Sequence, residues 1–151
     1  MTFYDIDFNA LYKQHLIACN HYNLPPEKWD KKAVKMAENL VGKASRYNQQ
    51  LLEPMQVQPD ESVLDIGCGP GTFAIPLAQQ GSQVYALDYS TGMLDVLAEY
   101  KQKLQLENLN LIRRSWAENW DDVPQVDVIL ASRSTLVDDL DDMIEKLCAK
   151  A

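Results

Sequence analysis

The feature that most constrains the fold is a change of hydrophobic period near residue 60. Beyond it, four short runs rich in Val, Ile and Leu alternate with segments of helical pattern. The apolar runs are SVLDI (62–66), QVYAL (83–87), NLNLI (108–112) and QVDVILA (125–131), and the helical segments are 72–80, 90–104 and 138–150. Parallel strands need a crossover, which a helix supplies, so this alternation predicts βαβ units. Because the runs are apolar at nearly every position, we expect an α/β fold: a parallel sheet with helices on both faces.

The residues before this change of period are helical in pattern. Apolar side chains recur at helical spacing over residues 6–19. A second helix is expected to begin near Asp30, a favourable N-cap residue, and a further helical piece ends near Pro54. The length of 151 residues suits a single domain. Within it we expect a helical cap or lid (residues 1–58) and an α/β half-domain (residues 59–151).

Several targeting and redox signals are missing from the sequence. No apolar run approaches the roughly 20 residues of a membrane span, and the first residues do not have the pattern of a signal peptide. The three cysteines are an odd number at spacings unlike those of a zinc motif. We therefore expect a cytoplasmic protein with reduced thiols, no membrane contact and no metal.

Charge is distributed unevenly along the chain. Residues 61–151 carry fifteen acidic and seven basic side chains, whereas residues 1–60 carry seven of each, so the second part accounts for the whole net charge of −8. Such a surface repels phosphate backbones. The composition therefore disfavours a nucleic-acid partner.

Three glycines follow the first apolar run, as G-x-G-x-G at Gly67, Gly69 and Gly71. Between a strand and a helix, such a loop lets a ligand approach the backbone, and Thr72 could help to start the helix. The dinucleotide fingerprint would instead place its third glycine at Thr72. Asp65, at the strand end, would repel a pyrophosphate and favours a cationic ligand, although it could simply cap the loop.

A second acid, Asp88, ends the next apolar run, 21 residues after Gly67. At this position of a βαβ unit, an Asp commonly accepts hydrogen bonds from ribose hydroxyls. Two acids around a glycine loop predict a ligand with a ribose, a positive charge and no phosphate.

These segments resemble a known family. VLDIGCGPG (63–71) followed by LDYSTGML (87–94) is similar to motif I and the region after it in class I S-adenosylmethionine-dependent methyltransferases, over roughly residues 60–135. The resemblance implies a Rossmann-like fold and S-adenosylmethionine as cofactor. It assigns Asp65 and the backbone of Gly67, Cys68 and Gly69 to the methionine part, with Thr72 beside them, Asp88 to the ribose, and Tyr89 and Met93 to the adenine.

The family often has an acid after the third strand that accepts the adenine amino group. This chain has Ser115, Trp116 and Ala117 there, and the resemblance implies an adenine contact from Ser115 or from the backbone of the next two residues. Trp116 and Trp120 could equally pack against the sheet. Ser132, at the end of the fourth run, lies where the family brings the transferring methyl group near the acceptor.

Helices before motif I often fold over the cofactor in this family, so Trp29 and Tyr47 could belong to a lid or pack in the core. Cys68 is expected to be a small loop residue and not a nucleophile, because no His is near it in sequence. Arg113 and Arg114 resemble a solvated strand end.

The family fold has seven strands in the order 3-2-1-4-5-7-6, and this chain supplies the first four. We therefore expect a fragment, or a chain completed by a partner, whose open edge at the fourth strand is available for self-association.

The resemblance implies transfer of a sulfonium methyl group to a small-molecule acceptor, and no catalytic residue is assigned. The segment SRST (132–135) lacks the NPPY-like tetrad of enzymes that methylate base or amide nitrogens. A non-catalytic methyltransferase-like module and an NAD-dependent oxidoreductase are the alternatives.

Overall fold

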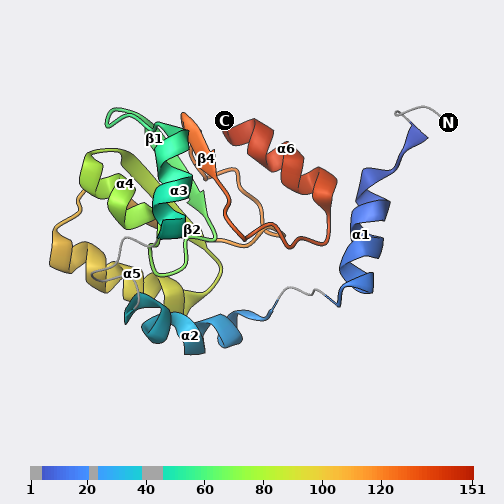
Figure 1. Ribbon diagram of the computed structural model, residues 1–151, viewed down its shortest axis with the longest axis horizontal. Helices are drawn as coiled ribbons and strands as arrows, with labels where there is room; N and C mark the ends of the chain where they lie inside the picture. Colours follow the sequence, from blue (N-terminus) through green and yellow to red (C-terminus); the bar gives the residue numbers. More distant parts are fainter. Residues whose placement is uncertain (1–4, 21–23, 39–45) are drawn as a thin grey trace.

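The computed structural model describes residues 5–20, 24–38 and 46–151 (Figure 1). In these residues the predicted strands and the three helices that alternate with them are present, and no helix is long and apolar enough to cross a membrane. The elements are α1 (Phe8–Ala18), α2 (Pro26–Glu38), α3 (Arg46–Met55), β1 (Ser62–Ile66), α4 (Ala74–Gln80), β2 (Gln83–Asp88), α5 (Thr91–Leu104), β3 (Leu109–Arg113), β4 (Val128–Leu130) and α6 (Leu140–Lys150).

The strands form one parallel sheet in the order β3-β2-β1-β4, as the resemblance implies. Successive residues of β1 face opposite layers: Val63 packs in a cluster with α4 and α5, and Leu64 packs in a second cluster with Trp120 and Leu147 of α6. The sheet is therefore covered on both faces. Because the strands are parallel, their carboxyl ends meet at one edge, where ligands bind in folds of this kind.

β4 is shorter than the predicted run, and of the residues before it Val126 bonds outside the sheet whereas Asp127 bonds the first residue of β1. The Val126 N–H donates to the Lys150 carbonyl at the end of α6 (2.9 Å). Asp127 joins the start of β1: its N–H donates to the Ser62 carbonyl (3.1 Å), and its carboxylate accepts from the Ser62 hydroxyl (2.6 Å). Only three residues then remain for the strand.

The predicted start of the second helix at Asp30 is wrong. α2 begins at Pro26, whose fixed φ and missing N–H suit the first helical position. Asp30 lies inside α2, and its carboxylate accepts from the Ser90 hydroxyl (2.6 Å) and the Gly92 N–H (2.9 Å). It is a capping acid for α5 and not for its own helix.

The predicted role of Thr72 as a helix start is also wrong, because α4 begins at Ala74 and its N-cap residue is Phe73, whose side chain makes no cap bond. Pro76 is the third residue of α4 and has no N–H that could donate to the Thr72 carbonyl. The side-chain amide of Asn48, from α3, donates to that carbonyl instead (3.3 Å). α3 thus supplies a hydrogen bond that α4 cannot make.

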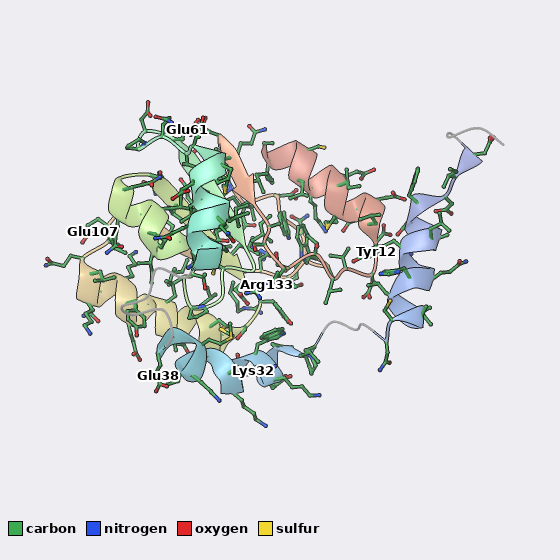
Figure 2. All side chains as sticks on the ribbon, in the orientation of Figure 1. Tyr12, Lys32, Glu38, Glu61, Glu107 and Arg133 are labelled. Atoms are coloured by element: carbon green, nitrogen blue, oxygen red, sulfur yellow. The ribbon has the colours of Figure 1, made fainter. Side chains whose placement is uncertain are left out.

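α1 lies beside α6 and the loop before it, away from the sheet (Figures 1 and 2). The Tyr12 hydroxyl donates to the Thr135 carbonyl (2.6 Å), and the Asn9 side chain bonds Asp139 (3.1 Å) and the Leu140 N–H (3.0 Å). No residue of α1 is buried, so the apolar side chains of this helix do not enter the core.

Candidate functional site

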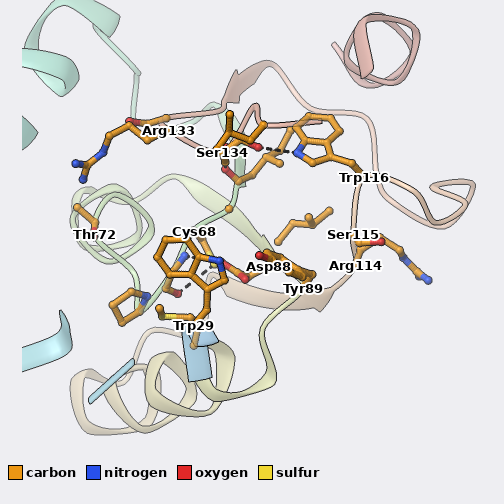
Figure 3. A pocket seen from close by; sticks show the side chains of 18 of the residues that line it. Trp29, Cys68, Thr72, Asp88, Tyr89, Arg114, Ser115, Trp116, Arg133 and Ser134 are labelled. Atoms are coloured by element: carbon orange, nitrogen blue, oxygen red, sulfur yellow. Dashed lines mark hydrogen bonds between the residues drawn. The ribbon is translucent and has the colours of Figure 1, made fainter. Parts of the chain in front are cut away.

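A cavity of about 500 Å³ lies at the carboxyl edge of the sheet (Figure 3). This volume is in the range of small-molecule sites. The cavity is lined by ten of the predicted site residues: Gly67, Cys68, Gly69, Thr72, Asp88, Tyr89, Met93, Ser115, Trp116 and Ser132. Asp65 and Ala117 do not line it. The fold thus brings most of these residues together, and their role in binding stays a prediction.

The N–H groups of the glycine loop are used within the protein. A loop that binds phosphate presents its backbone N–H groups to the ligand. In this loop those groups are already bonded to the protein. Pro70 has no N–H, and the other four donate internally: Gly67 and Cys68 to the Leu87 carbonyl (2.7 and 3.1 Å), Gly69 to Asp88 Oδ2 (2.9 Å) and Gly71 to the Cys68 carbonyl (3.1 Å).

Asp65 is buried two residues before the glycine loop, with 1% of its surface exposed. Burial raises its pKa to about 7; a hydrogen bond from the Ala74 N–H opposes this shift, and the charge of Asp88 adds to it. Its Oδ2 has no hydrogen-bond partner. The carboxylate therefore caps the start of α4, and its second oxygen keeps acceptor capacity for a cation, so both predicted roles remain open.

Asp88 lines the cavity and is itself held by the loop. Its Oδ2 accepts from the Gly69 N–H and its Oδ1 from the Ser90 N–H, each at 2.9 Å. Burial raises the pKa of Asp88 above its usual value, and these hydrogen bonds oppose the shift. Each carboxylate oxygen has two lone pairs, so Asp88 keeps the acceptor capacity that a ribose contact needs.

Ser134 completes the cavity wall and was missed by sequence reasoning. Its hydroxyl donates to the Ile66 carbonyl (2.6 Å), and a Cβ added to Gly67 would lie 2.3 Å from the Ser134 Cβ. Gly67 also has a φ of +68°, which favours glycine. The loop after β4 therefore sits directly on the glycine loop. The available signal was the second serine of SRST, two residues after Ser132.

Trp116 and Trp120 stack with ring centroids 4.9 Å apart, Trp120 within the second core cluster and Trp116 against it, so the predicted packing role is confirmed and an adenine contact stays a prediction. Trp116 lines the cavity and donates to the Ser134 carbonyl (2.7 Å; Figure 3). Trp120 is buried in the core and donates to the Ser115 carbonyl (2.8 Å). The Ser115 N–H donates to Glu118 (2.6 Å), which fixes this turn beside the cavity.

Trp29 of α2 lines the cavity opposite Trp116 (Figure 3). The Tyr89 hydroxyl donates to the Leu24 carbonyl, just before α2, at 2.6 Å. Of the two lid candidates, Trp29 thus contacts the cavity, and the Tyr47 side chain lies outside the described residues. The division into a cap (1–58) and a half-domain (59–151) stays a prediction.

The predictions for the Cys68 thiol and for the two arginines at the end of β3 have different outcomes. Burial raises the pKa of the Cys68 thiol well above its usual value, so the thiol is protonated at neutral pH and not poised as a nucleophile. Arg113 is solvated, with 57% of its side chain exposed, but Arg114 lines the cavity, is 24% exposed and pairs with Asp122. The prediction of a solvated strand end therefore holds for Arg113 and is wrong for Arg114.

Comparison with known proteins identifies the family. The family model of the methyltransferase domain matches residues 63–150. An uncharacterized protein of Haemophilus influenzae is 80% identical over 151 residues, which are all of this chain and 56% of that protein. A demethylmenaquinone methyltransferase of Oceanobacillus iheyensis is 36% identical over 69 residues, 44% of this chain and 29% of that enzyme. The chain spans about half the length of the first relative and less of the second.

A solved structure agrees with this match. Coclaurine N-methyltransferase, bound to N-methylheliamine and S-adenosylhomocysteine, superposes with a TM-score of 0.51 at 26% identity, over 55% of this chain and 24% of that enzyme. The family model covers more than half of the chain, including the glycine loop and Asp88. The chain therefore belongs to the class I S-adenosylmethionine-dependent methyltransferases, a family whose cofactor is S-adenosylmethionine.

Proposed function

We propose that the chain binds S-adenosylmethionine in this cavity and transfers the methyl group to a small-molecule acceptor. The observation that carries the proposal is the glycine loop, whose N–H groups are used internally and which has Asp65 and Asp88 beside it. Two carboxylates without free N–H donors favour a positively charged nucleoside over a phosphate ligand. The family membership supports the same cofactor.

The residues present fit this cofactor. Asp88 has acceptor capacity for the ribose hydroxyls, and Asp65 Oδ2 is buried without a hydrogen-bond partner, so a nearby positive charge would favour its ionised form. Tyr89 and Met93 offer apolar surface to a flat ring. When bound, the cofactor supplies a methyl group on a positively charged sulfur.

The chain's own contribution would be alignment and the exclusion of water. Trp29 and Trp116 bound the cavity from opposite sides, and Ser134 fixes one loop onto the other. The described lining has no His or Lys, and the Cys68 thiol is protonated, so no general base is assigned. We therefore propose an acceptor that needs no base from these residues. The charge of −8 and the SRST segment disfavour nucleic acid as that acceptor.

Titration calorimetry with S-adenosylhomocysteine and with NADH tests the binding step. We expect the first ligand to bind and NADH not to bind. Asp88→Ala should weaken S-adenosylhomocysteine binding roughly tenfold to a hundredfold, about 1.5–3 kcal/mol, because hydrogen bonds to a charged group are lost. Asp95→Ala, at an exposed position of α5, is the matched control and should keep full affinity. NADH binding without S-adenosylhomocysteine binding, or full affinity in Asp88→Ala, would contradict the proposal.

A non-catalytic module that binds the cofactor is the second candidate, favoured by the lack of an assigned base among the described lining residues. Incubating the chain with methyl-labelled cofactor and a panel of small acceptors separates the two. Labelled product supports the enzyme, whereas tight binding without product across the panel supports the module.

A further inference from the structure

Arg133 has a backbone conformation that the rest of the chain does not explain. Four non-glycine residues of the described chain have a left-handed φ: Asn20, Gln56, Gln105 and Arg133. The first three follow the ends of α1, α3 and α5, where this conformation commonly terminates a helix. Arg133, with φ of +55°, lies between β4 and α6 and follows no helix. A strained non-glycine residue that ends no helix points to a local function.

The fold holds Arg133 at the cavity. Ser132, Arg133 and Ser134 all line it, and the bonds from Ser134 to Ile66 and from Trp116 to Ser134 fix this loop at both the glycine loop and the turn after β3. Arg133 lies on the same side of the cavity as Thr72, opposite Arg114 (Figure 3). The strain is therefore maintained by contacts around it, and its effect is to place an arginine at the cavity rim.

The cavity has few charged lining residues, and its two arginines lie on opposite sides of it. Its charged lining residues in the described chain are Asp88, Arg114 and Arg133. Arg114 pairs with Asp122 on one side of the cavity, and Arg133 lies on the opposite side, near Thr72. Residues 61–151 are strongly acidic, so a cation at this rim is not a consequence of a generally basic surface. A guanidinium group matches the planar geometry of a carboxylate.

We propose that Arg133 binds a carboxylate at the rim of the cavity. Two sources have this chemistry: the amino-acid end of the cofactor, whose cationic and ribose parts the acids Asp65 and Asp88 would take, or a carboxylate on the methyl acceptor. The first source depends on the proposed function, and the second depends only on the cavity.

Measuring the affinity of the Arg133→Gln and Arg133→Lys chains for the cofactor and for benzoate distinguishes these two sources of the carboxylate. If Arg133 binds the cofactor carboxylate, Arg133→Gln should weaken S-adenosylmethionine binding about tenfold or more and leave decarboxylated S-adenosylmethionine unchanged. If it binds the acceptor, cofactor affinity stays constant and the variant loses binding of benzoate to the chain saturated with S-adenosylhomocysteine. Arg133→Lys should recover part of either loss. Lys103→Gln, which removes an exposed positive charge of α5 outside the cavity, is the matched control and should change neither.

The melting temperature gives a readout independent of the ligands. Arg133→Gly relieves the left-handed strain, so it should melt at or above the temperature of the wild type while losing carboxylate binding. A variant that melts lower and binds every carboxylate probe like the wild type would overturn the inference. So would an Arg133→Gln chain with wild-type affinity for both S-adenosylmethionine and benzoate. A wild-type chain that binds benzoate through Arg133 but no S-adenosylmethionine would refute the proposed function and retain the carboxylate site.

Discussion

The two acids beside the glycine loop weaken the fold that contains them. Burial raises the pKa of both Asp65 and Asp88, which means that the folded chain favours their neutral forms relative to water. Hydrogen bonds from the Ala74, Ser90 and Gly69 N–H groups offset this only in part. A nearby cation would favour the ionised forms. Acids that cost stability in this way are expected where ligand binding has been selected.

Asp65 should make the stability of the chain depend on pH. Its folded pKa, about 7, lies above the usual 3.8, so the folded state holds the proton more tightly than the unfolded state. The tighter proton binding of Asp65 stabilises the folded chain below pH 4 by up to a few kcal/mol, and this stabilisation is lost as pH rises to about 7. Asp65→Asn has no such proton. Urea unfolding from pH 4 to pH 8 should therefore show the variant gaining stability relative to the wild type across that window. Parallel pH profiles for the two chains would contradict the pKa assignment.

At the scale of elements, the helices before β1 supply hydrogen bonds that the α/β part cannot make by itself. Asp30 of α2 accepts from Ser90 and Gly92 at the start of α5, and Asn48 of α3 donates to Thr72 before α4. Thr72 lines the cavity, and Ser90 directly follows Tyr89, which also lines it. Neither could be predicted from the sequence, because each joins segments that only the folded chain brings together.

Asp30 should couple α2 to the cavity through Ser90, whose N–H holds Asp88. Asp30→Ala removes the acceptor for Ser90 and Gly92, so we expect a lower urea midpoint and weaker S-adenosylhomocysteine binding. Asp30→Asn keeps one side-chain oxygen as acceptor and should restore most of both. An Ala variant that loses stability but keeps full affinity would show that this contact does not position the cavity.

Asn48 and Pro76 should show a double-mutant coupling. Asn48→Ala leaves the Thr72 carbonyl without its donor and should cost about 0.5–1.5 kcal/mol of unfolding free energy. In a Pro76→Ala chain, residue 76 regains an N–H that can donate to the same carbonyl, so Asn48→Ala should cost less there. Urea unfolding of the four chains measures the coupling. Equal costs in the two backgrounds would mean that the Asn48 amide does not replace the proline N–H.

At the scale of the whole molecule, the sheet could be predicted because its signals are local. β1 has the predicted bounds, since its apolar residues and the following Gly67 mark it directly. The resemblance of the glycine loop and the LDYSTGML segment to the family implied ten residues that do line the cavity. The length of β4 and the role of Ser134 could not be predicted, because Val126 bonds the end of α6 and Ser134 packs on Gly67, far away in sequence.

The open edge of β4 and the net charge of the chain act in opposite directions on self-association. β4 is an end strand, paired with β1 and composed of Val, Ile and Leu. The Asp127 N–H donates to Ser62 of β1, so the alternation along a strand directs the Val128 N–H away from β1. An apolar edge with unpaired N–H groups tends to pair with another strand. A net charge of −8 opposes that contact while it is unscreened.

Salt should therefore convert the chain from monomer to dimer. Sedimentation velocity at about 0.01 M salt should show monomer, and at about 1 M, where the Debye length is only about 3 Å, a dimer that grows with protein concentration. Val128→Pro removes the outward N–H but leaves the bonds to β1, so it should keep the chain monomeric at both concentrations of salt. A dimer that persists in Val128→Pro would place the contact on another surface. A monomer at every salt and protein concentration would show that this edge does not pair.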